Sequence, residues 1–217
     1  MSNIINIAID GPAGSGKSTI AKIIAKKLNI TYLDTGSMYR AFTYYALENN
    51  VESDDKKNII KLLENIDLVL DKDEIFVNGK NVTKEIRFEN IDKNVSKYAA
   101  IKEVRERMVN IQRDISKGKS VIMDGRDIGS VVLPDAEFKF YMDASAEERA
   151  KRRYLQNIER GKEVPYDDIL EDIRLRDEND KNREVDPLVV CEDATVIDTS
   201  DMTIDEVVDF IINKVNG

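Results

Sequence analysis

The sequence predicts an α/β fold, in which a P-loop parallel sheet carries helices on both faces. Apolar runs of strand length alternate with segments of helical periodicity along most of the chain. The first apolar run, residues 4–9, leads directly into a glycine-rich loop and then into a helical pattern over 17–28. Because alternating strands and helices build parallel sheets, we expect one principal sheet whose first strand delivers that loop.

The glycine-rich loop, residues 11–18, reads Gly-Pro-Ala-Gly-Ser-Gly-Lys-Ser and fills every fixed position of a phosphate-binding loop. Its glycines let backbone N–H groups curl around a phosphate, and the following helix adds the partial positive charge of its N-terminus. We expect Lys17 to reach the β- and γ-phosphates and the Ser18 hydroxyl to bind Mg²⁺. A plain glycine turn is the alternative, which the flanking strand and helix disfavour. The expected nucleotide contacts are Gly11, Pro12, Ala13, Gly14, Ser15, Gly16, Lys17, Ser18 and Thr19.

The next segments continue the alternation. A short strand is predicted over 31–33, followed by a helix over 37–48 with Phe42 and Ala46 on its apolar face, and a second helix over about 55–64. The later elements of the core are predicted as strands over 119–123, 138–142 and 194–197 and helices over 101–116, 146–159, 166–180 and 203–214.

An antiparallel element interrupts this pattern. Two apolar runs, 66–70 and 74–77, are separated by Asp-Lys-Asp, and Asn78-Gly79 then provides a strong hairpin turn. We therefore expect an inserted subdomain over about 63–100 with a small antiparallel sheet. The single P-loop domain, 1–217, then has its core over about 1–62, 101–148 and 185–217, and a helical lid over about 149–184.

The composition excludes several classes of chemistry. The chain of 217 residues has no histidine and one cysteine, so it offers no Ser-His or Cys-His pair and no ordinary zinc site. The groups that remain for catalysis are carboxylates, lysine, arginine and a metal ion bound through oxygen. Enzymes that transfer phosphoryl groups use these groups. The net charge of −9 disfavours nucleic-acid binding, so an anionic substrate must be held by local cations. We expect a cytoplasmic monomer that binds neither nucleic acid nor a membrane.

Two further constellations follow predicted strands. Leu-Asp-Thr-Gly-Ser-Met-Tyr-Arg, residues 33–40, turns from a strand into a helix, and Arg40 can meet a second phosphate near that N-terminus. Simple helix capping is the alternative. Asp124-Gly125-Arg126-Asp127 ends a buried strand, where open α/β sheets bind ligands and where an aspartate can organise a metal ion. The alternative there is a glycine turn with a mutually neutralising Arg126–Asp127 pair.

The expected lid is rich in arginine. Arg149 and Arg153 are four residues apart on one helical face, and Arg176 and Arg183 are seven apart, compatible with one face if that helix continues. A Gly-Lys-Glu-Val-Pro loop, residues 161–165, separates the two helices. A salt-bridged pair of solvated helices is the default interpretation, and a lid that closes cations over phosphates and excludes water is the functional one.

In order along the chain, these motifs resemble those of bacterial cytidylate kinases, P-loop nucleoside monophosphate kinases. The motifs include Asp-Gly-Arg-Asp-Ile-Gly with Val-Val-Leu-Pro-Asp-Ala after it, and Arg-Asp-x-x-Asp-x-x-Arg over residues 176–183. The phosphate loop alone is unspecific, whereas the Asp-Gly-Arg-Asp-Ile-Gly block and the insertion are much more telling. The resemblance covers essentially the whole chain. It implies a Mg²⁺-dependent transfer of the γ-phosphate of ATP to CMP or dCMP, by a core, a nucleotide-binding insertion and a lid.

The resemblance also implies site residues. Thr35 and Arg40 should meet the CMP phosphate region, Ser96, Arg105 and Asp127 should read the base, and Arg176 and Arg183 should straddle the phosphates. The expected catalytic residues are Lys17, Asp124, Arg126, Arg153 and Arg176. The expected substrate-binding residues are Asp34, Thr35, Arg40, Ser96, Arg105, Arg126, Asp127, Arg176 and Arg183, with Ser18 as the metal ligand.

The chemistry of cytosine suits that base-reading set. A carboxylate can accept from the N4 amino group and an arginine can donate to N3 or O2, whereas uracil reverses this edge. Kinases of other small acceptors (UMP, AMP or shikimate) and a P-loop nucleotide switch are the alternatives. The insertion disfavours the shortest kinase folds, and the missing Asn-Lys-x-Asp motif disfavours a guanine-nucleotide switch.

Overall fold

The computed structural model describes residues 4–71, 73–159 and 161–217. Residues 1–3, 72 and 160, which fall in the expected core, insertion and lid respectively, lie outside the described part. The chain divides into two units, one formed by the residues up to Leu33 together with Gly118–Gly217, and the other by Asp34–Lys117. Among the described residues, no helix is both long and apolar enough to cross a membrane.

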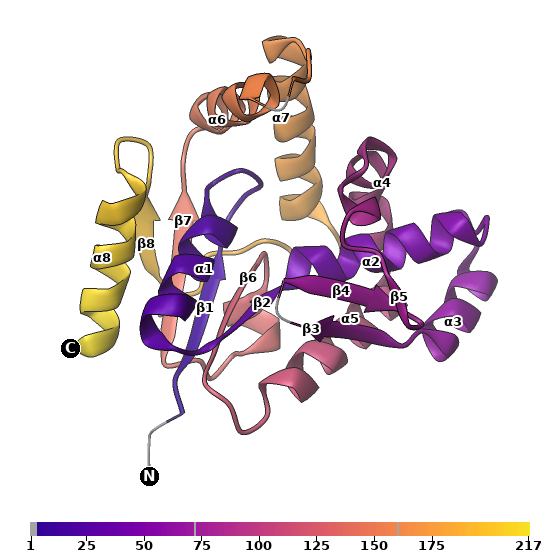
Figure 1. Ribbon diagram of the computed structural model, residues 1–217, viewed down its shortest axis with the longest axis horizontal. Helices are drawn as coiled ribbons and strands as arrows, with labels where there is room; N and C mark the ends of the chain where they lie inside the picture. The colour runs from indigo at the N-terminus through magenta and orange to yellow at the C-terminus, as the bar shows by residue number, and fades with distance from the viewer. Residues whose placement is uncertain (1–3, 72, 160) are drawn as a thin grey trace. The chain divides into compact units, whose positions relative to one another are not determined.

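The first unit is built on the parallel sheet that the sequence predicted. Its strand order is β2-β6-β1-β7-β8, with β1 paired in parallel to β6 and β7, and β7 to β8 (Figure 1). The first strand therefore lies at the centre, and its carboxyl end opens into the phosphate loop. The strands are β1 (Asn6–Asp10), β2 (Thr31–Asp34), β6 (Val121–Gly125), β7 (Phe138–Asp143) and β8 (Thr195–Asp198).

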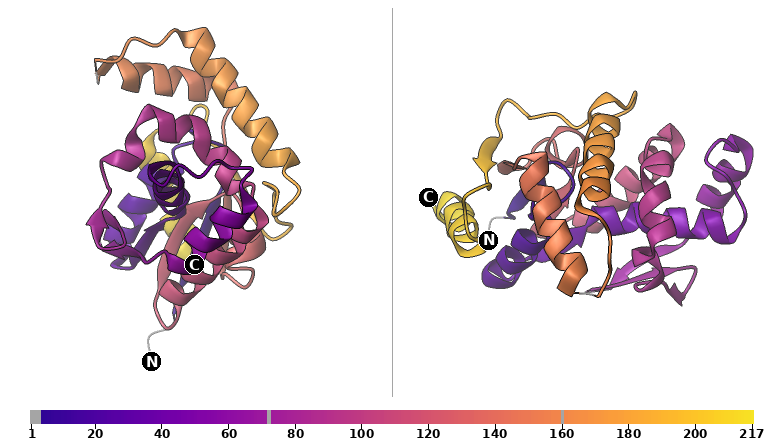
Figure 2. Two further views of the ribbon diagram at one scale, coloured as in Figure 1. Left: turned by 90° about the vertical axis from the view of Figure 1, so that its right-hand side faces the viewer. Right: turned by 90° about the horizontal axis from the view of Figure 1, so that it is seen from above.

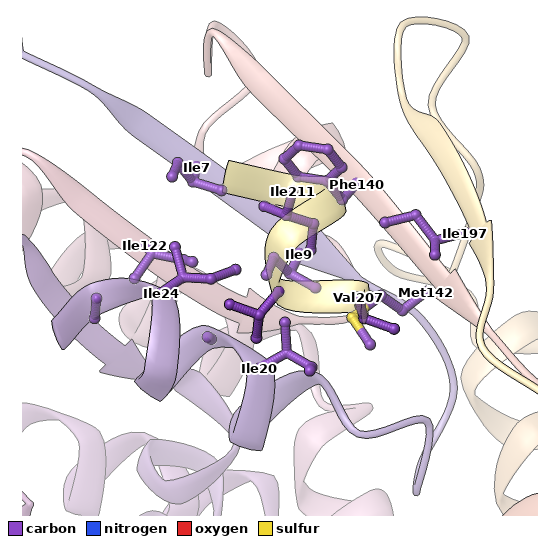
Figure 3. Packing of buried hydrophobic residues seen from close by; sticks show 13 residues of the cluster. Ile7, Ile9, Ile20, Ile24, Ile122, Phe140, Met142, Ile197, Val207 and Ile211 are labelled. Carbon is purple, nitrogen blue, oxygen red and sulfur yellow. The ribbon is translucent and has the colours of Figure 1, made fainter. Parts of the chain in front are cut away.

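Two helices cover one face of this sheet, α1 (Lys17–Leu28) and α8 (Ile204–Asn216). Ile7 and Ile9 of β1 are fully buried against Ile20 and Ile24 of α1, and Ile211 of α8 lies in the same cluster (Figure 3). Each such side chain contributes about 1.5–3 kcal/mol by leaving water. This packing fixes α1 on the sheet, and with it the start of the helix that follows the phosphate loop.

The ends of these two helices have local causes. Asn29, in the left-handed region with φ 52°, ends α1 and donates its N–H to Ala25 O. The Thr203 side chain accepts from the N–H of Glu206, whose carboxylate accepts in return from the N–H of Thr203, which starts α8 with a capping box.

The expected lid consists of α6 (Ala146–Glu159) and α7 (Tyr166–Asn182), which lie side by side in both views of Figure 2. Ala150 of α6 packs with Ile169 and Ile173 of α7 in a small apolar cluster of their own. The condition for a shared face of Arg176 and Arg183 is not met: α7 ends at Asn182, and Arg183, with its extended backbone, is the C-cap residue. Arg176 and Arg183 therefore do not share a helical face.

The second unit holds the predicted hairpin and more helix than expected. The three-stranded antiparallel sheet β3-β4-β5 turns between its last two strands at Asn78 and Gly79, both with positive φ (50° and 78°), as a two-residue hairpin requires. The elements are α2 (Thr35–Glu48), α3 (Lys56–Asn65), β3 (Leu68–Asp71), β4 (Glu74–Val77), β5 (Lys80–Asn81), a 3₁₀ turn η1 (Glu85–Arg87), α4 (Glu89–Ala99) and α5 (Lys102–Ser116).

The compact unit, 34–117, is wider than the insertion expected over 63–100. The reason is that α2 packs on α4: the ring of Phe42 meets Tyr98 edge to face at 6.2 Å, and the Tyr98 hydroxyl donates to Val51 O at 2.6 Å. The helices that precede and follow the small sheet along the chain therefore belong to the same compact unit as the sheet. The sequence interpretation assigned no helix to 89–99, although Ile91, Val95 and Tyr98 recur at helical spacing and are buried.

Candidate active site

The phosphate loop has the backbone that its glycines predict. Gly11, Gly14 and Gly16 have φ of 146°, 80° and 91°, a region that side chains disfavour. A Cβ on Gly11 would lie only 2.0 Å from Met142 O on the neighbouring strand β7, so no other residue fits there. Gly16 is also the N-cap of α1, so the loop leads its amides to the positive end of that helix.

Lys17 lies inside this loop. Its Nζ donates to Pro12 O at 2.6 Å and to Ser15 Oγ at 3.2 Å, and the residue is only 4% exposed. Burial, with the nearby Arg126 guanidinium, lowers the pKa of Lys17, while Asp124 and Asp10 oppose that shift. An incoming phosphate would supply the negative charge that the buried ammonium group needs, so this site is poised for an anion.

A second group of oxygen atoms lies beside the loop. Asp124, at the end of β6, accepts from Ser18 Oγ at 2.7 Å and from the Tyr32 hydroxyl at 2.8 Å. A hydroxyl next to a carboxylate is a donor set that suits Mg²⁺. Among the described residues, no cluster of three or more acidic, cysteine or histidine side chains could hold a metal ion. These residues therefore fit an ion that takes its remaining ligands from phosphate and water.

The Asp124–Asp127 segment is tied to α7. Arg126 Nε donates to Asp180 Oδ2 at 2.7 Å, and Arg183 Nη2 lies 3.3 Å from Asp127 Oδ1. Burial by itself would lower the pKa of Arg126, but the attraction of Asp180 outweighs it and raises that pKa. Arg126 and Asp127, which the alternative interpretation paired with each other, thus both have oppositely charged partners outside their own turn.

In the expected lid, Arg149 of α6 reaches the phosphate loop. It is 3% exposed, and its Nη1 donates to Ala13 O and to Asp177 Oδ1, both at 3.0 Å. Arg153, the residue expected to be catalytic, lies on the exposed part of α6, and Arg176 is half-buried on α7. The sequence interpretation had noted Arg149 only as part of a basic face, and it assigned no role to Asp177, a residue of the 176–183 motif.

The second unit presents its own candidates at the start of α2. Asp34 is the N-cap of this helix: Oδ1 accepts from Ser37 N at 2.9 Å and Oδ2 from Ser37 Oγ at 2.6 Å. Arg87, which the sequence interpretation missed, donates to Asp34 Oδ2 at 3.3 Å and to Ser37 Oγ at 3.0 Å. Thr35 is buried directly after the cap. Asp34 therefore acts as a helix cap, as the alternative interpretation proposed. The exposed guanidinium of Arg87 binds the same carboxylate.

The remaining candidates of this unit lie on α2, α4 and α5. Arg40 pairs with Asp92 of α4. Arg105 is 1% exposed, donates to Ala99 O at 3.1 Å and lies 5.5 Å above the Tyr39 ring. Ser96 is half-buried on α4. A guanidinium this deeply buried is costly, so its place beside an aromatic ring and a carbonyl indicates a fixed donor rather than a solvated surface charge.

A parallel sheet with a phosphate loop after its first central strand, a buried lysine in that loop and arginines from α6 and α7 define a P-loop kinase fold. Two solved structures share it: an uncharacterized protein from Eubacterium ventriosum (TM-score 0.55, 15% identity, 98% of this chain and 99% of that one) and shikimate kinase from Bacteroides thetaiotaomicron (TM-score 0.51, 12% identity, 99% and 100%). At such low identity these likenesses show the fold alone.

The family is shown by sequence. The cytidylate kinase family model matches residues 7–217. A curated cytidylate kinase of Clostridium perfringens (strain SM101 / Type A) is 54% identical over 211 residues, 97% of each chain, and one of Fusobacterium nucleatum is 52% identical over 215 residues, 99% of this chain and 98% of that one. The chain belongs to the cytidylate kinase family.

Proposed function

We propose that this protein transfers the γ-phosphoryl group of ATP to CMP or dCMP, giving CDP or dCDP. The observation that carries this proposal is the match of the cytidylate kinase family to residues 7–217, with an intact phosphate loop and its buried lysine inside the matched region. We further propose that the protein works as a monomer on small molecules.

On the donor side, the loop amides over 11–19 hold the β- and γ-phosphates of ATP, and Lys17 balances their charge. The Ser18 hydroxyl, with Asp124 close by, would hold Mg²⁺, and this ion would neutralise part of the phosphate charge when bound. The hydrogen bonds from Ser18 and Tyr32 orient the Asp124 carboxylate, which supports this proposal because the carboxylate is already aimed at the Ser18 hydroxyl.

On the acceptor side, the phosphate of CMP is itself the nucleophile. It is already anionic, so no strong general base is needed and catalysis consists of positioning and electrostatic stabilisation. Arg126 and Arg176 neutralise the charge that spreads over the transferring group, and Arg153 acts from α6. Arg40 and Thr35 hold the CMP phosphate, and Arg183 acts on the same phosphates.

The base is selected by hydrogen-bond polarity. Asp127 accepts from the N4 amino group of cytosine, and Arg105 and Ser96 serve its N3 and O2 side. Uracil presents an acceptor at position 4 and a donor at N3, so both groups would then face the wrong partner. Unpaired buried polar groups are costly, which makes this discrimination strong.

The test is a panel of acceptors in a coupled assay that measures ADP production, with each ribo- and deoxyribonucleoside monophosphate and shikimate. CMP and dCMP should give the highest kcat/KM. A higher kcat/KM for AMP, UMP or shikimate would overturn the assignment, and ATP hydrolysis that is indifferent to every acceptor would favour a nucleotide switch.

A further inference from the structure

Asp10 is a buried carboxylate that the mechanism above does not use. It is the last residue of β1, directly before Gly11, and is only 5% exposed. Its Oδ1 accepts from the N–H of Ile128 at 2.8 Å and its Oδ2 from the N–H of Gly129 at 2.7 Å. One side chain at the mouth of the phosphate loop thus binds the two amides that follow Asp127 in the chain.

Those two amides open a single helical turn, 128–132, of the π type. Within it, the N–H of Val131 donates to Asp127 O at 2.9 Å, but the opening amides of such a turn have no carbonyl before them to bind. Asp10 therefore caps the turn from a neighbouring strand. This fixes the backbone at Asp127, which is the first residue before the turn.

The close approach leaves little room for a side chain at position 129. A Cβ on Gly129 would lie 3.4 Å from Asp10 Oδ2, 3.4 Å from Cys191 Sγ and 3.2 Å from Lys139 Cδ. A methyl group would thus be in ordinary contact with two of these neighbours and tight only against the flexible lysine, whereas a branched side chain would have no room for its further carbons and would displace the amide from the carboxylate. The bidentate contact of Asp10 and the absence of a side chain at position 129 belong to one arrangement.

We propose that Asp10 is a positioning residue of the acceptor site: by capping the turn after Asp127, it sets the direction in which that carboxylate meets the base of the acceptor. The inference rests on the proposed function, because it assigns Asp10 a role in reading the acceptor. Because Asp10 also directly precedes Gly11, this one residue connects the turn after Asp127 to the start of the phosphate loop.

The electrostatics of Asp10 agree with a functional role. Burial, opposed by the two backbone hydrogen bonds, and the neighbouring Asp127 charge raise the pKa of Asp10 to about 6. At neutral pH, which lies above that pKa, the carboxylate is mainly ionised, although burial makes the ionised form less favourable in the folded protein than in the unfolded chain. The charge on Asp10 therefore does not increase the stability of the fold. It does allow the carboxylate to accept hydrogen bonds from two amides at once.

The decisive variant is Asp10→Asn. Asparagine keeps the shape but offers one acceptor, and its NH₂ group would face an N–H donor. We expect the KM for CMP to rise tenfold or more and the CMP/UMP ratio of kcat/KM to fall. The KM for ATP should stay within twofold and the melting temperature should not fall, because the cost of burying a charge is removed as well.

Two further variants complete the test. Gly129→Val, whose branched side chain lacks room beside Asp10, should reproduce the rise in the KM for CMP without changing any charge, and it decides the matter if Asp10→Asn does not fold. Asp143→Asn is the matched control: Asp143 also ends a strand of the sheet, but its Oδ1 accepts from the N–H of Ala144, the next residue in the chain, rather than from a distant turn. It should leave both KM values and the CMP/UMP ratio unchanged.

The outcomes separate the two proposals. If the wild-type protein turns over CMP but the folded Asp10→Asn protein keeps its KM for CMP and its CMP/UMP ratio within twofold, Asp10 has no positioning role. Equal rises in the KM for CMP and for ATP, with a lower melting temperature, would show a merely structural role. Absence of CMP turnover in the wild-type protein would instead overturn the proposed function itself.

Discussion

Arg126 Nε lies 2.7 Å from Asp180 Oδ2, so a largely buried ion pair joins the segment after β6 to α7. A second pair, Asp127 with Arg183, joins the same two parts of the chain one residue further along. In the proposed mechanism both arginines meet phosphates. Their carboxylate partners therefore keep two buried guanidinium groups oriented until an anion arrives, and an anion can then compete for them.

Removal of this partner should cost stability. Asp180→Asn leaves the Arg126 guanidinium buried without its counter-ion, so we expect the free energy of unfolding to fall by about 3–5 kcal/mol. Urea denaturation measures the change. Glu178→Gln, on an exposed position of the same helix, is the control and should change stability by less than about 0.5 kcal/mol. Equal stabilities of the two variants would contradict the ion pair.

The same pair has a defined pH dependence. Burial alone would raise the pKa of Asp180, but attraction to Arg126 and Arg176 holds it below its ordinary value of 3.8. For a carboxyl group with a lowered pKa in the folded state, the stabilisation is fully present above that ordinary value. It is lost as the pH falls through the lowered pKa. The stability difference between wild type and Asp180→Asn should therefore be constant near neutral pH and shrink at strongly acidic pH.

Lys17→Ala should abolish transfer and leave the fold intact. Lys17 contributes its charge to the transferring phosphoryl group, and its Nζ is bound by Pro12 O and Ser15 Oγ of the loop, so we expect kcat to fall more than about a hundredfold. The melting temperature should not fall, since the mutation also removes a buried cation. Near-normal turnover with CMP would contradict the role assigned to the phosphate loop.

Base selection should depend on Asp127. In Asp127→Asn an NH₂ donor can replace the carboxylate oxygen, and O4 of uracil can accept from it. CMP should then lose about 1–3 kcal/mol of transition-state binding, while UMP loses less or gains. The measurement is kcat/KM for both substrates. A merely structural role, including the pair with Arg183, predicts an equal fall for both and an unchanged ratio.

The lid should become protected on binding. The helices α6 and α7 share a small apolar cluster of their own, and in the proposed mechanism arginines of this region contact the phosphates of bound nucleotides. Hydrogen exchange over 150–159 and 161–183 should therefore slow when ATP and CMP bind together. Identical exchange with and without both nucleotides would contradict lid closure.

The sequence predicted those features whose cause is local. The strand, glycine loop and helix over 4–28 and the Asn78-Gly79 hairpin follow from periodicity and from positive φ, which glycine and asparagine tolerate. The helical periodicity of α4 was also present in the sequence. The sequence interpretation described the insertion only by its small antiparallel sheet, however, and did not assign this helix.

The missed features depend on distant partners. The spacing of Arg149 and Arg153 places both on one face of a helix and does not tell which of them reaches the loop. The contacts with Ala13 and Asp177 show that Arg149 reaches it. The sequence offered one indication that Asp10 is functional, because a carboxylate ends an otherwise apolar strand there. Its two hydrogen-bond partners, however, lie 118 and 119 residues further along the chain. Spacing along the chain cannot supply such pairs.

The most direct test of the account is identification of the products by ³¹P NMR after the protein is mixed with ATP, Mg²⁺ and CMP. We predict that CDP and ADP form in equal amounts in the wild-type protein, with no CDP above background in Lys17→Ala. ADP with inorganic phosphate and no CDP, or equal CDP formation by both proteins, would contradict it.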